Sequence, residues 1–365
     1  MSRPPLDLPL EALIDKVQTA RSLKEPLLIR GGGTKDFYGE ALKGTPLDTT
    51  ALTGISDYTP SELVVTVRGG TPLAALEAAL AGRGQCLAFE PPRFGSTGTV
   101  GGMVAAGLAG PARAYVGGIR DYVLGATILN GRAEVLSFGG RVMKNVAGYD
   151  VARLYAGSMG VLGVILEVSL KVLPVPPKVK TLRFEMDQAE ALKRLRTWGR
   201  QPLPINASAW WDGMLILRLA GAQAAVQTAV AALGGEVIEQ TLADNFWRGL
   251  RDHKDEFFQG AEKAVAAGAT LWRVSVPQKT KPLQLSGEQL IEWGGAQRWV
   301  VTSAAPSVLR DAAAQAGGHA TVFRGDKRAG AMAPLPPVQQ RIQRELKESF
   351  DPERLFNPGR LYPDF

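Results

Sequence analysis

The chain has 365 residues, a length that predicts two domains. Its composition, 45% apolar and 21% charged, is that of a soluble globular protein. The single cysteine, Cys86, excludes an internal disulfide and any four-cysteine iron–sulfur or zinc site. The net charge of +7 is spread without a basic run interleaved with aromatics, so no nucleic-acid partner is expected. No apolar run approaches the ~20 residues that span a bilayer, and the first residues lack the core of a secretory signal. We therefore expect a cytoplasmic protein.

The first predicted elements are a helix over residues 10–21 and a strand over residues 27–29, which ends at the run Gly31-Gly-Gly-Thr-Lys-Asp36. Glycine tolerates positive φ, so backbone N–H groups in such a run can converge on one phosphate or pyrophosphate. The run is not a Walker A loop, because Thr34-Lys35 reverses the required order. It is not a Rossmann turn either, because Asp36 stands where a third glycine is needed. Two interpretations remain, an anion nest and a flexible turn.

A second glycine-rich segment favours the anion nest. It follows a strand predicted over residues 62–67 and a helix over residues 73–80 with Thr71 as N-cap. The run Pro91-Pro-Arg-Phe-Gly-Ser-Thr-Gly-Thr-Val-Gly-Gly102 then leads into small apolar residues. This pattern predicts a loop that feeds a helix N-terminus, where free N–H groups and the helix dipole favour phosphate.

A third glycine-rich segment lies beyond a hairpin predicted over residues 122–138, with Asn130-Gly131 as its turn. The segment runs over residues 144–154 and continues as Gly157-Ser-Met-Gly-Val-Leu-Gly163. Glycine at every third position would let the backbone approach a flat ligand closely. Val164 and Ile165 then begin a strand that reaches residue 170.

The run Leu173-Pro-Val-Pro-Pro177 separates two regions of different pattern. Residues 179–240 follow the order β-α-β-β-α-β of a ferredoxin-like unit, with a hairpin turn at Asp212-Gly213. Beyond it we expect helices over residues 244–258, 283–291, 307–316 and 339–348, and strands over residues 270–276, 298–302 and 320–323. The second half is therefore predicted to be an α+β domain.

The three glycine-rich segments, with the connecting run Gly118-Ile-Arg-Asp-Tyr-Val-Leu-Gly125, resemble the PCMH-type FAD-binding domain of the vanillyl-alcohol oxidase superfamily. More narrowly, the chain is similar to the small FAD-binding subunits of bacterial glycolate oxidases. That similarity rests on Glu90-Pro-Pro92, Gly101-Gly-Met-Val-Ala105, Met143-Lys-Asn-Val-Ala-Gly-Tyr-Asp150 and Phe356-Asn-Pro-Gly-Arg360. The resemblance implies an α+β fold in three parts: a PCMH-type, two-subdomain FAD-binding domain (residues 1–175), an α+β, ferredoxin-like cap domain (residues 176–335) and a C-terminal tail that returns to the FAD domain (residues 336–365).

The resemblance also implies FAD as the cofactor. The residues that it assigns to FAD binding are Gly31, Gly32, Gly33, Thr34, Lys35, Pro91, Thr99, Val100, Gly101, Gly102, Ala105, Asp121, Val123, Tyr149, Asp150, Gly160, Gly163, Val164, Ile165 and Asn357. The first loop would hold the pyrophosphate, with Lys35 screening its charge. Asp121 and Asp150 would be polar anchors or loop caps. Many superfamily members attach flavin covalently through a histidine in or near the pyrophosphate loop, where this chain has Thr34 and Lys35. We therefore expect non-covalent FAD.

The chain has only two histidines, His253 and His319, to serve as the base that oxidation of a 2-hydroxy acid needs. His319 begins a predicted cap strand that could face the flavin, so it is the candidate catalytic residue; a structural or surface role is the alternative. His253 lies in a charged run and is expected to be solvated. The two histidines give no convincing metal site, so no metal is expected.

Three functions remain open, and each makes the chain an FAD-dependent oxidoreductase. The first is an FAD-binding subunit of a glycolate oxidase (2-hydroxyacid dehydrogenase) complex, which assists oxidation of glycolate to glyoxylate while electrons pass to a partner. By resemblance, its partners are a larger FAD-containing glycolate oxidase subunit and an iron–sulfur subunit, through which it would lie peripherally at the inner membrane. The second is a self-sufficient flavin-dependent 2-hydroxyacid dehydrogenase. The third is a MurB-like flavin reductase, for which the sequence shows no separate NADPH site. The scarcity of histidines favours the first.

Overall fold

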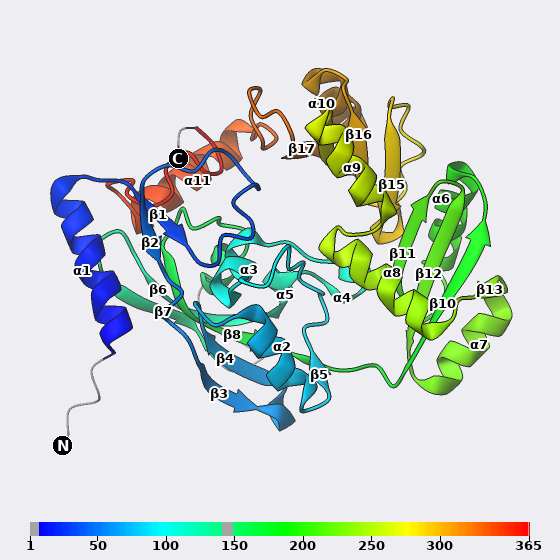
Figure 1. Ribbon diagram of the computed structural model, residues 1–365, viewed down its shortest axis with the longest axis horizontal. Helices are drawn as coiled ribbons and strands as arrows, with labels where there is room; N and C mark the ends of the chain where they lie inside the picture. The colour runs from blue at the N-terminus through cyan, green and yellow to red at the C-terminus, as the bar shows by residue number, and fades with distance from the viewer. Residues whose placement is uncertain (1–6, 141–148, 364) are drawn as a thin grey trace.

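The computed structural model describes residues 7–140, 149–363 and 365 (Figure 1). Two antiparallel sheets organise the chain, a five-stranded sheet in the N-terminal half and an eight-stranded sheet in the C-terminal half. They lie on opposite sides of the view in Figure 1, and the last helix, α11 (Pro337–Phe350), returns to the N-terminal side. The chain thus crosses between the two sheets twice.

The five-stranded sheet has the order β3-β4-β8-β6-β7. Its central strand, β8, is largely buried because both of its edges are paired and most of its side chains are apolar. Helices α2 and α3 share the hydrophobic core of this sheet. The bounds are β3 (Ile55–Thr59), β4 (Val64–Arg68), α2 (Leu73–Ala81), α3 (Val100–Ala106), α4 (Arg113–Val116), α5 (Ile119–Tyr122), β6 (Val123–Leu129), β7 (Val135–Gly139) and β8 (Val164–Lys171), with a small separate sheet of β5 (Gln85–Cys86) and β9 (Leu173–Pro174).

A second, smaller layer holds the start of the chain. Helix α1 (Leu8–Leu23) buries an apolar stripe that includes Leu13 and Val17 against a parallel pair of strands, β1 (Leu27–Arg30) and β2 (Thr45–Asp48). The helix begins at Asp7, whose Oδ1 accepts a hydrogen bond from Leu10 N at 3.4 Å. Strand β1 leads directly into the first glycine run, so this layer positions that run.

The eight-stranded sheet has the order β13-β10-β12-β11-β15-β16-β14-β17. Its first four strands, with α6 and α7, have the ferredoxin-like topology that the sequence predicted. The other four strands continue the sheet through the β11–β15 pairing. The bounds are β10 (Lys178–Glu185), α6 (Gln188–Trp198), β11 (Ile205–Trp211), β12 (Met214–Gly221), α7 (Gln223–Leu233), β13 (Glu236–Val237), α8 (Gln240–Asp252), α9 (Glu256–Ala266), β14 (Thr270–Ser275), β15 (Glu288–Glu292), β16 (Gln297–Thr302), α10 (Pro306–Gln315) and β17 (His319–Arg324).

Two predicted helices in this half are wrong. No helix forms over residues 283–291: residues 283–287 have no regular structure, and residues 288–291 belong to strand β15, which pairs with β11 on one side and β16 on the other. The single helix expected over residues 244–258 is two helices, α8 and α9. His253 ends α8 with a left-handed φ of 55°, and Asp255 Oδ1 caps α9 by accepting from Phe258 N at 3.0 Å.

Two predicted turn and cap assignments also differ. Thr71 is not the N-cap of α2; Pro72 holds that position, and Thr71 Oγ1 bonds the backbone of Gly54 instead. The hairpin between β6 and β7 has a longer loop than a two-residue Asn-Gly turn. The side-chain oxygen of Asn130, Oδ1, stabilises this loop by accepting hydrogen bonds from Arg132 N and Glu134 N, each at 2.9 Å. The Asp212-Gly213 turn is confirmed, with positive φ at both residues.

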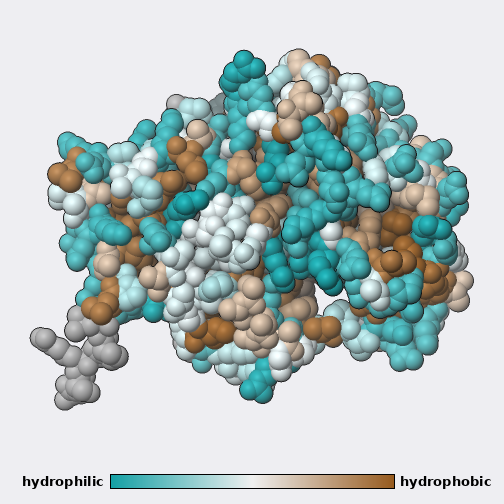
Figure 2. Space-filling model, in the orientation of Figure 1, coloured by the Kyte–Doolittle hydropathy of each residue, from teal (hydrophilic) through white to brown (hydrophobic). Residues whose placement is uncertain are grey.

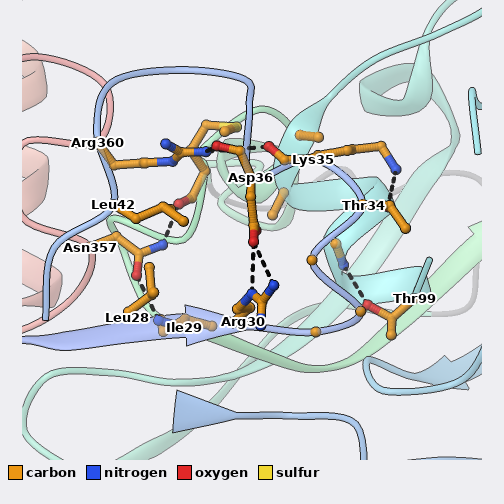
Figure 3. A pocket seen from close by; sticks show the side chains of 17 residues that line it. Leu28, Ile29, Arg30, Thr34, Lys35, Asp36, Leu42, Thr99, Asn357 and Arg360 are labelled. Carbon is orange, nitrogen blue, oxygen red and sulfur yellow. Dashed lines mark hydrogen bonds and ion pairs between the residues drawn. The ribbon is translucent and has the colours of Figure 1, made fainter. Parts of the chain in front are cut away.

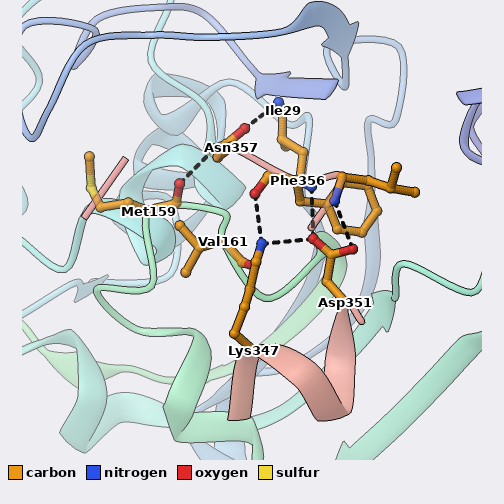
Figure 4. A network of polar contacts seen from close by, with 8 residues as sticks. Ile29, Met159, Val161, Lys347, Asp351, Phe356 and Asn357 are labelled. Atoms are coloured by element: carbon orange, nitrogen blue, oxygen red, sulfur yellow. Dashed lines mark hydrogen bonds and ion pairs between the residues drawn. The ribbon is translucent and has the colours of Figure 1, made fainter. Parts of the chain in front are cut away.

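The C-terminal tail is tied to the N-terminal half (Figure 4). The tail backbone forms two hydrogen bonds with Leu27 of β1: Leu27 N donates to Leu355 O at 2.7 Å, and Asn357 N donates to Leu27 O at 2.9 Å. The Phe350 ring at the end of α11 joins the core of the five-stranded sheet. Residues at opposite ends of the sequence therefore lie side by side at the strand that precedes the glycine run.

Candidate functional site

The first glycine run lines a hollow between β1, α3 and the C-terminal tail (Figure 3). The hollow has an empty volume of about 570 Å³, part of it open to solvent. It brings together predicted cofactor residues from three distant segments, namely Gly31, Gly32, Gly33, Thr34, Lys35, Thr99, Gly102, Ala105 and Asn357.

The backbone of the first run packs directly against the second glycine loop. A Cβ on Gly32 would lie 1.6 Å from the carbonyl oxygen of Thr97, and a Cβ on Gly31 would lie 2.4 Å from Thr99 Oγ1. Gly33 has a φ of +69°, a conformation that glycine adopts without strain. The close packing argues against a free, flexible turn.

Lys35 supplies the positive charge of this hollow. Burial lowers the pKa of its ammonium to about 8, and the nearby Asp252 opposes the shift. Among the described residues, its Nζ has Thr34 Oγ1 as a hydrogen-bond partner at 3.5 Å and lies 5.7 Å from the centre of the Phe94 ring. A mostly buried ammonium without a paired carboxylate is costly by itself and is stabilised by a bound anion. These residues therefore fit a cofactor that carries phosphate groups.

Two residues of the tail hold the surrounding loops in place. Asn357 Oδ1 accepts from Ile29 N at 2.7 Å, and its Nδ2 donates to the carbonyl oxygen of Met159 at 2.6 Å. The Arg360 guanidinium donates to the carbonyl oxygens of Asp36, at 2.9 Å, and of Glu40. The sequence predicts Asn357 as a cofactor-binding residue but not Arg360, although both belong to the same Asn-Pro-Gly-Arg run.

A second hollow adjoins the first and shares part of its lining, including Gly31, Gly102, Ala105 and Asn357. Its empty volume is about 390 Å³. The predicted cofactor residues that only this hollow contains are Gly101, Gly160, Gly163, Val164 and Ile165. Gly160 has a φ of +76°, and a Cβ there would lie 2.6 Å from Asn357 Nδ2. The third glycine segment thus extends the space that begins at the first.

The other predicted cofactor residues line neither hollow. Asp121 Oδ2 accepts from Gly118 N at 2.8 Å as a helix cap, and Asp150 forms an ion pair with Arg153 at 2.9 Å. Tyr149 is 97% exposed. Pro91, Val100 and Val123 are buried. Residues 143–148 of the same motif as Tyr149 and Asp150 lie outside the described residues, so the roles of these two stay predictions.

A third cavity, with an empty volume of about 330 Å³, lies between the two halves of the chain. The N-terminal half contributes residues 92, 94 and 108–111, and the cap side contributes Leu250, Arg251, His253, Arg273, Glu292, Trp293, Trp299 and Phe323. No local sequence signal indicates this cluster, because its members come from separate strands and helices. The candidate base His319 is not in its lining; His319 starts β17 with an exposed side chain.

The expectation that His253 is solvated is wrong. Its ring stacks on Phe258 with centroids 3.7 Å apart and meets the edge of Phe94 at 5.0 Å. Nδ1 is buried and has no hydrogen-bond partner among the residues that the structure describes. Burial, with help from the Arg324 and Arg273 cations, lowers the pKa of the imidazole well below its ordinary value. His253 is therefore neutral at physiological pH.

Glu292 is a second perturbed group in this cavity. The residue is 5% exposed, and its Oε2 accepts from Trp299 Nε1 at 2.7 Å. Burial raises the pKa of Glu292 to about 8. The next residue, Trp293, has a left-handed φ of 54°, which costs energy for a bulky side chain. Such strain and such a perturbed acid together are typical of a functional site.

Over the described residues, no helix is long and apolar enough to cross a membrane, and no group of three or more His, Cys, Asp or Glu side chains is arranged to hold a metal ion. Figure 2 shows a largely hydrophilic face on which the apolar side chains form separate patches.

Comparison with known proteins defines the class. The FAD-binding domain family matches residues 10–139. The fold is similar to that of alkyldihydroxyacetonephosphate synthase, with a TM-score of 0.64 and 15% identity over 95% of this chain and 75% of the other. The predicted α+β fold with an FAD-binding domain is therefore confirmed, and the chain is a flavoprotein of the FAD-dependent oxidoreductases.

Sequence similarity narrows the class further. The chain is 45% identical over 355 residues to the glycolate oxidase subunit GlcE of Escherichia coli (strain K12), covering 97% of each. It is 32% identical to subunit GlcD of Bacillus subtilis (strain 168), over 43% of this chain and 34% of the relative. It is 33% identical to a D-lactate dehydrogenase of Anaerostipes hadrus, over 40% of this chain and 30% of the relative. The chain belongs to the GlcE family of glycolate oxidase subunits.

Proposed function

We propose that the chain carries FAD, bound non-covalently in the two adjoining hollows, as a subunit of a complex that oxidises glycolate to glyoxylate. The 45% identity to GlcE over 97% of both chains carries the proposal. Two features of the site support the mode of binding. Glycine loops line both adjoining hollows, and among the described residues no histidine or cysteine lines either hollow to form a covalent bond to the flavin.

The residues of this chain would bind and orient the cofactor. FAD, when bound, supplies an acceptor for the hydride of an alcohol. The backbone of the run Gly31-Gly-Gly33 and the ammonium of Lys35 would balance the charge of its diphosphate. Asn357 and Arg360 would keep the loops on either side at a fixed separation. Pro91, Val100, Asp121, Val123, Tyr149 and Asp150 would support these loops from outside the hollows.

The domain division predicted from the sequence is part of the proposal: an FAD domain over residues 1–175, a cap over residues 176–335 and a returning tail over residues 336–365. It is supported by the position of the sheets, since β8 ends at Lys171 and β10 begins at Lys178. The tail's contacts with Leu27 and Ile29 support the return.

The partners that we propose are a larger FAD-containing subunit and an iron–sulfur subunit. The single cysteine of this chain cannot hold a four-cysteine cluster, so electrons that leave its flavin need another protein. The complex would be cytoplasmic, and any attachment to the inner membrane would come through the partners.

A second function, a self-sufficient 2-hydroxyacid dehydrogenase, is favoured by one observation. The cavity between the two halves holds a neutral imidazole, an arginine and a buried carboxyl group, the kinds of group that such an oxidation uses. His253, which lines this cavity, is then a better placed base than the predicted His319.

The experiment is co-expression of the tagged chain with the two partner subunits, followed by pull-down and assay. We expect both partners to be recovered, about one FAD per chain to be released intact by acid, and little glycolate oxidation by the isolated chain. Flavin that stays with the acid-denatured polypeptide would contradict non-covalent binding. Efficient turnover by the isolated chain would select the second function instead.

A further inference from the structure

The cavity between the two halves has an unbalanced positive charge. Arg251 and Asp252 neutralise each other through an ion pair at 2.7 Å. Arg273, in contrast, forms no ion pair within the described part of the chain; its Nε donates to the neutral Gln297 side chain at 2.9 Å. Since a partly buried guanidinium is rarely left without an acid partner, this one is available to an anion from outside.

The two other polar groups in the lining do not supply that anion. His253 is neutral, and Glu292 is mostly protonated at neutral pH because burial raises its pKa. Although both face the same cavity as Arg273, Glu292 is not within ion-pair distance of it and bonds Trp299 instead. When the Asp252 carboxylate, which pairs with Arg251 from outside the lining, is counted with it, the net charge at the cavity is close to +1. One carboxylate would balance this charge and two would exceed it.

The geometry of the wall restricts the size of the ligand. Aromatic rings, among them Phe94, Trp299 and Phe323, form part of the apolar lining, together with aliphatic side chains such as Leu108 and Leu250. The strained turn at Trp293 is fixed by a hydrogen bond across the two halves, from Trp293 Nε1 to Gly110 O at 3.0 Å. With an empty volume of about 330 Å³, the cavity is at the small end of ligand sites.

We propose that this cavity binds a small monocarboxylate of the 2-hydroxy or 2-oxo acid class, with Arg273 on the carboxylate and His253 and Glu292 facing the oxygen of the neighbouring carbon. The choice of this acid class rests on the proposed function, whereas the single negative charge follows from the lining. The chain is then itself an acid-binding subunit, not only a carrier of FAD. Glu292 acts as a neutral hydrogen-bonding group and Arg273 determines specificity for one carboxylate.

The test uses the full-length, FAD-loaded chain, titrated with glyoxylate and with oxalate. Binding is followed by calorimetry and by tryptophan fluorescence, because Trp293 and Trp299 line the cavity. We expect saturable binding of glyoxylate and at least about tenfold weaker binding of the dicarboxylate. Arg273→Gln should weaken glyoxylate binding about tenfold or more, since it removes a charge-assisted hydrogen bond. Arg273→Lys should recover part of the affinity, and Glu292→Gln should keep most of it.

Arg113→Gln is the matched control. The Arg113 guanidinium stacks on the same Trp293 ring, at 4.6 Å, as Arg273 does at 5.3 Å, but it does not line the cavity. Its loss should change affinity less than about twofold. The proposal is overturned if glyoxylate does not saturate, if oxalate binds equally well, or if Arg113→Gln is as damaging as Arg273→Gln. FAD content and partner recovery, measured on the same preparations, report on the proposed function separately.

Discussion

Lys347 and Asp351 form a buried ion pair one helical turn apart, with Nζ 2.7 Å from Oδ2 and side chains that are 2% and 0% exposed. Lys347 also donates to the carbonyl oxygens of Val161 at 2.7 Å and Phe356 at 2.9 Å, so each ammonium proton has an acceptor (Figure 4). Asp351 accepts from Leu355 N and Phe356 N. The pair therefore fastens the C-terminal tail to the loop that lines the second hollow.

Replacing Lys347 with methionine should be strongly destabilising. The change leaves the Asp351 carboxylate buried without its cation, which typically costs about 3–5 kcal/mol. It also removes the hydrogen bond that holds the loop around Val161, which lines the second hollow at Gly160 and Gly163, so FAD affinity should fall. Urea unfolding of the chain and FAD titration measure the two effects.

An exposed pair on the same helix provides the control. Arg341 and Glu345 have the same i,i+4 spacing, but their closest N–O distance is 3.7 Å and their side chains are 73% and 67% exposed. Arg341→Met should therefore cost less than about 1 kcal/mol. Equal destabilisation by Arg341→Met and Lys347→Met would show that the effect comes from helix propensity or charge alone.

The sequence predicts the elements of the fold correctly where a short local pattern determines the structure. The apolar stripe of α1, the Asp212-Gly213 turn and the ferredoxin-like order are all properties of short sequence windows. The failure over residues 283–291 has a different origin, because β15 is a strand only through its pairing with β11 and β16. Non-local pairing of this kind overrides the local preference of a short segment.

The glycine-lined hollow and the cavity around Arg273 also differ in whether local sequence patterns predict them. The hollow around Gly31 to Lys35 could be predicted because each glycine loop carries its own signal. The cavity around Arg273 could not, since Arg273, His253 and Glu292 lie on three elements that only the folded chain brings together. His253 shows the limit most clearly: its neighbours in sequence are charged, and its neighbours in space are aromatic.

Gly33→Ala should weaken FAD binding about tenfold or more. A side chain at a φ of +69° costs about 1–2 kcal/mol, and the Cβ would lie 2.3 Å from Arg30 Nη2, so the Arg30 side chain must move as well. Gly84→Ala is the control, because Gly84 has a similar φ of +65° and no atom of the described residues would lie within 4 Å of its Cβ. It should lower stability but leave FAD affinity unchanged. Equal affinities for the two variants would mean that the first glycine run does not contact the cofactor.

FAD binding should weaken as pH rises above about 8, the pKa to which burial lowers Lys35. Below that pH, the ammonium is already charged and binding takes up no proton. Above it, the anionic diphosphate must draw a proton onto Lys35, so affinity falls by up to about tenfold per pH unit. The folding stability of the FAD-free chain should change with pH in the opposite direction. The pKa of Lys35 in the folded state lies below the ordinary 10.5, so the charged Lys35 lowers the free energy of unfolding at pH 7. This loss of stability disappears as pH rises from about 8 to 10.5. FAD titrations of the wild type and Lys35→Met between about pH 6.5 and 9.5 measure the dependence, which the variant should lack.

Glu292 should make the folded chain less stable as pH rises toward 8. Burial raises its folded-state pKa from 4.5 to about 8, so the folded state holds the proton more strongly than the unfolded state between these values. Stability is therefore fully present at low pH and is lost at up to about 1.4 kcal/mol per pH unit until pH 8. Glu292→Gln removes the titration, so the unfolding free energy of the variant relative to the wild type should rise between about pH 6 and 8 and then level off.

Glu288→Gln is the matched control. Glu288 lies on the same strand as Glu292 and also accepts from a tryptophan Nε1, that of Trp211 at 2.7 Å, but it is exposed. Its relative unfolding free energy should stay constant over this range, and a constant value for Glu292→Gln as well would show that the buried carboxyl group is not protonated at neutral pH.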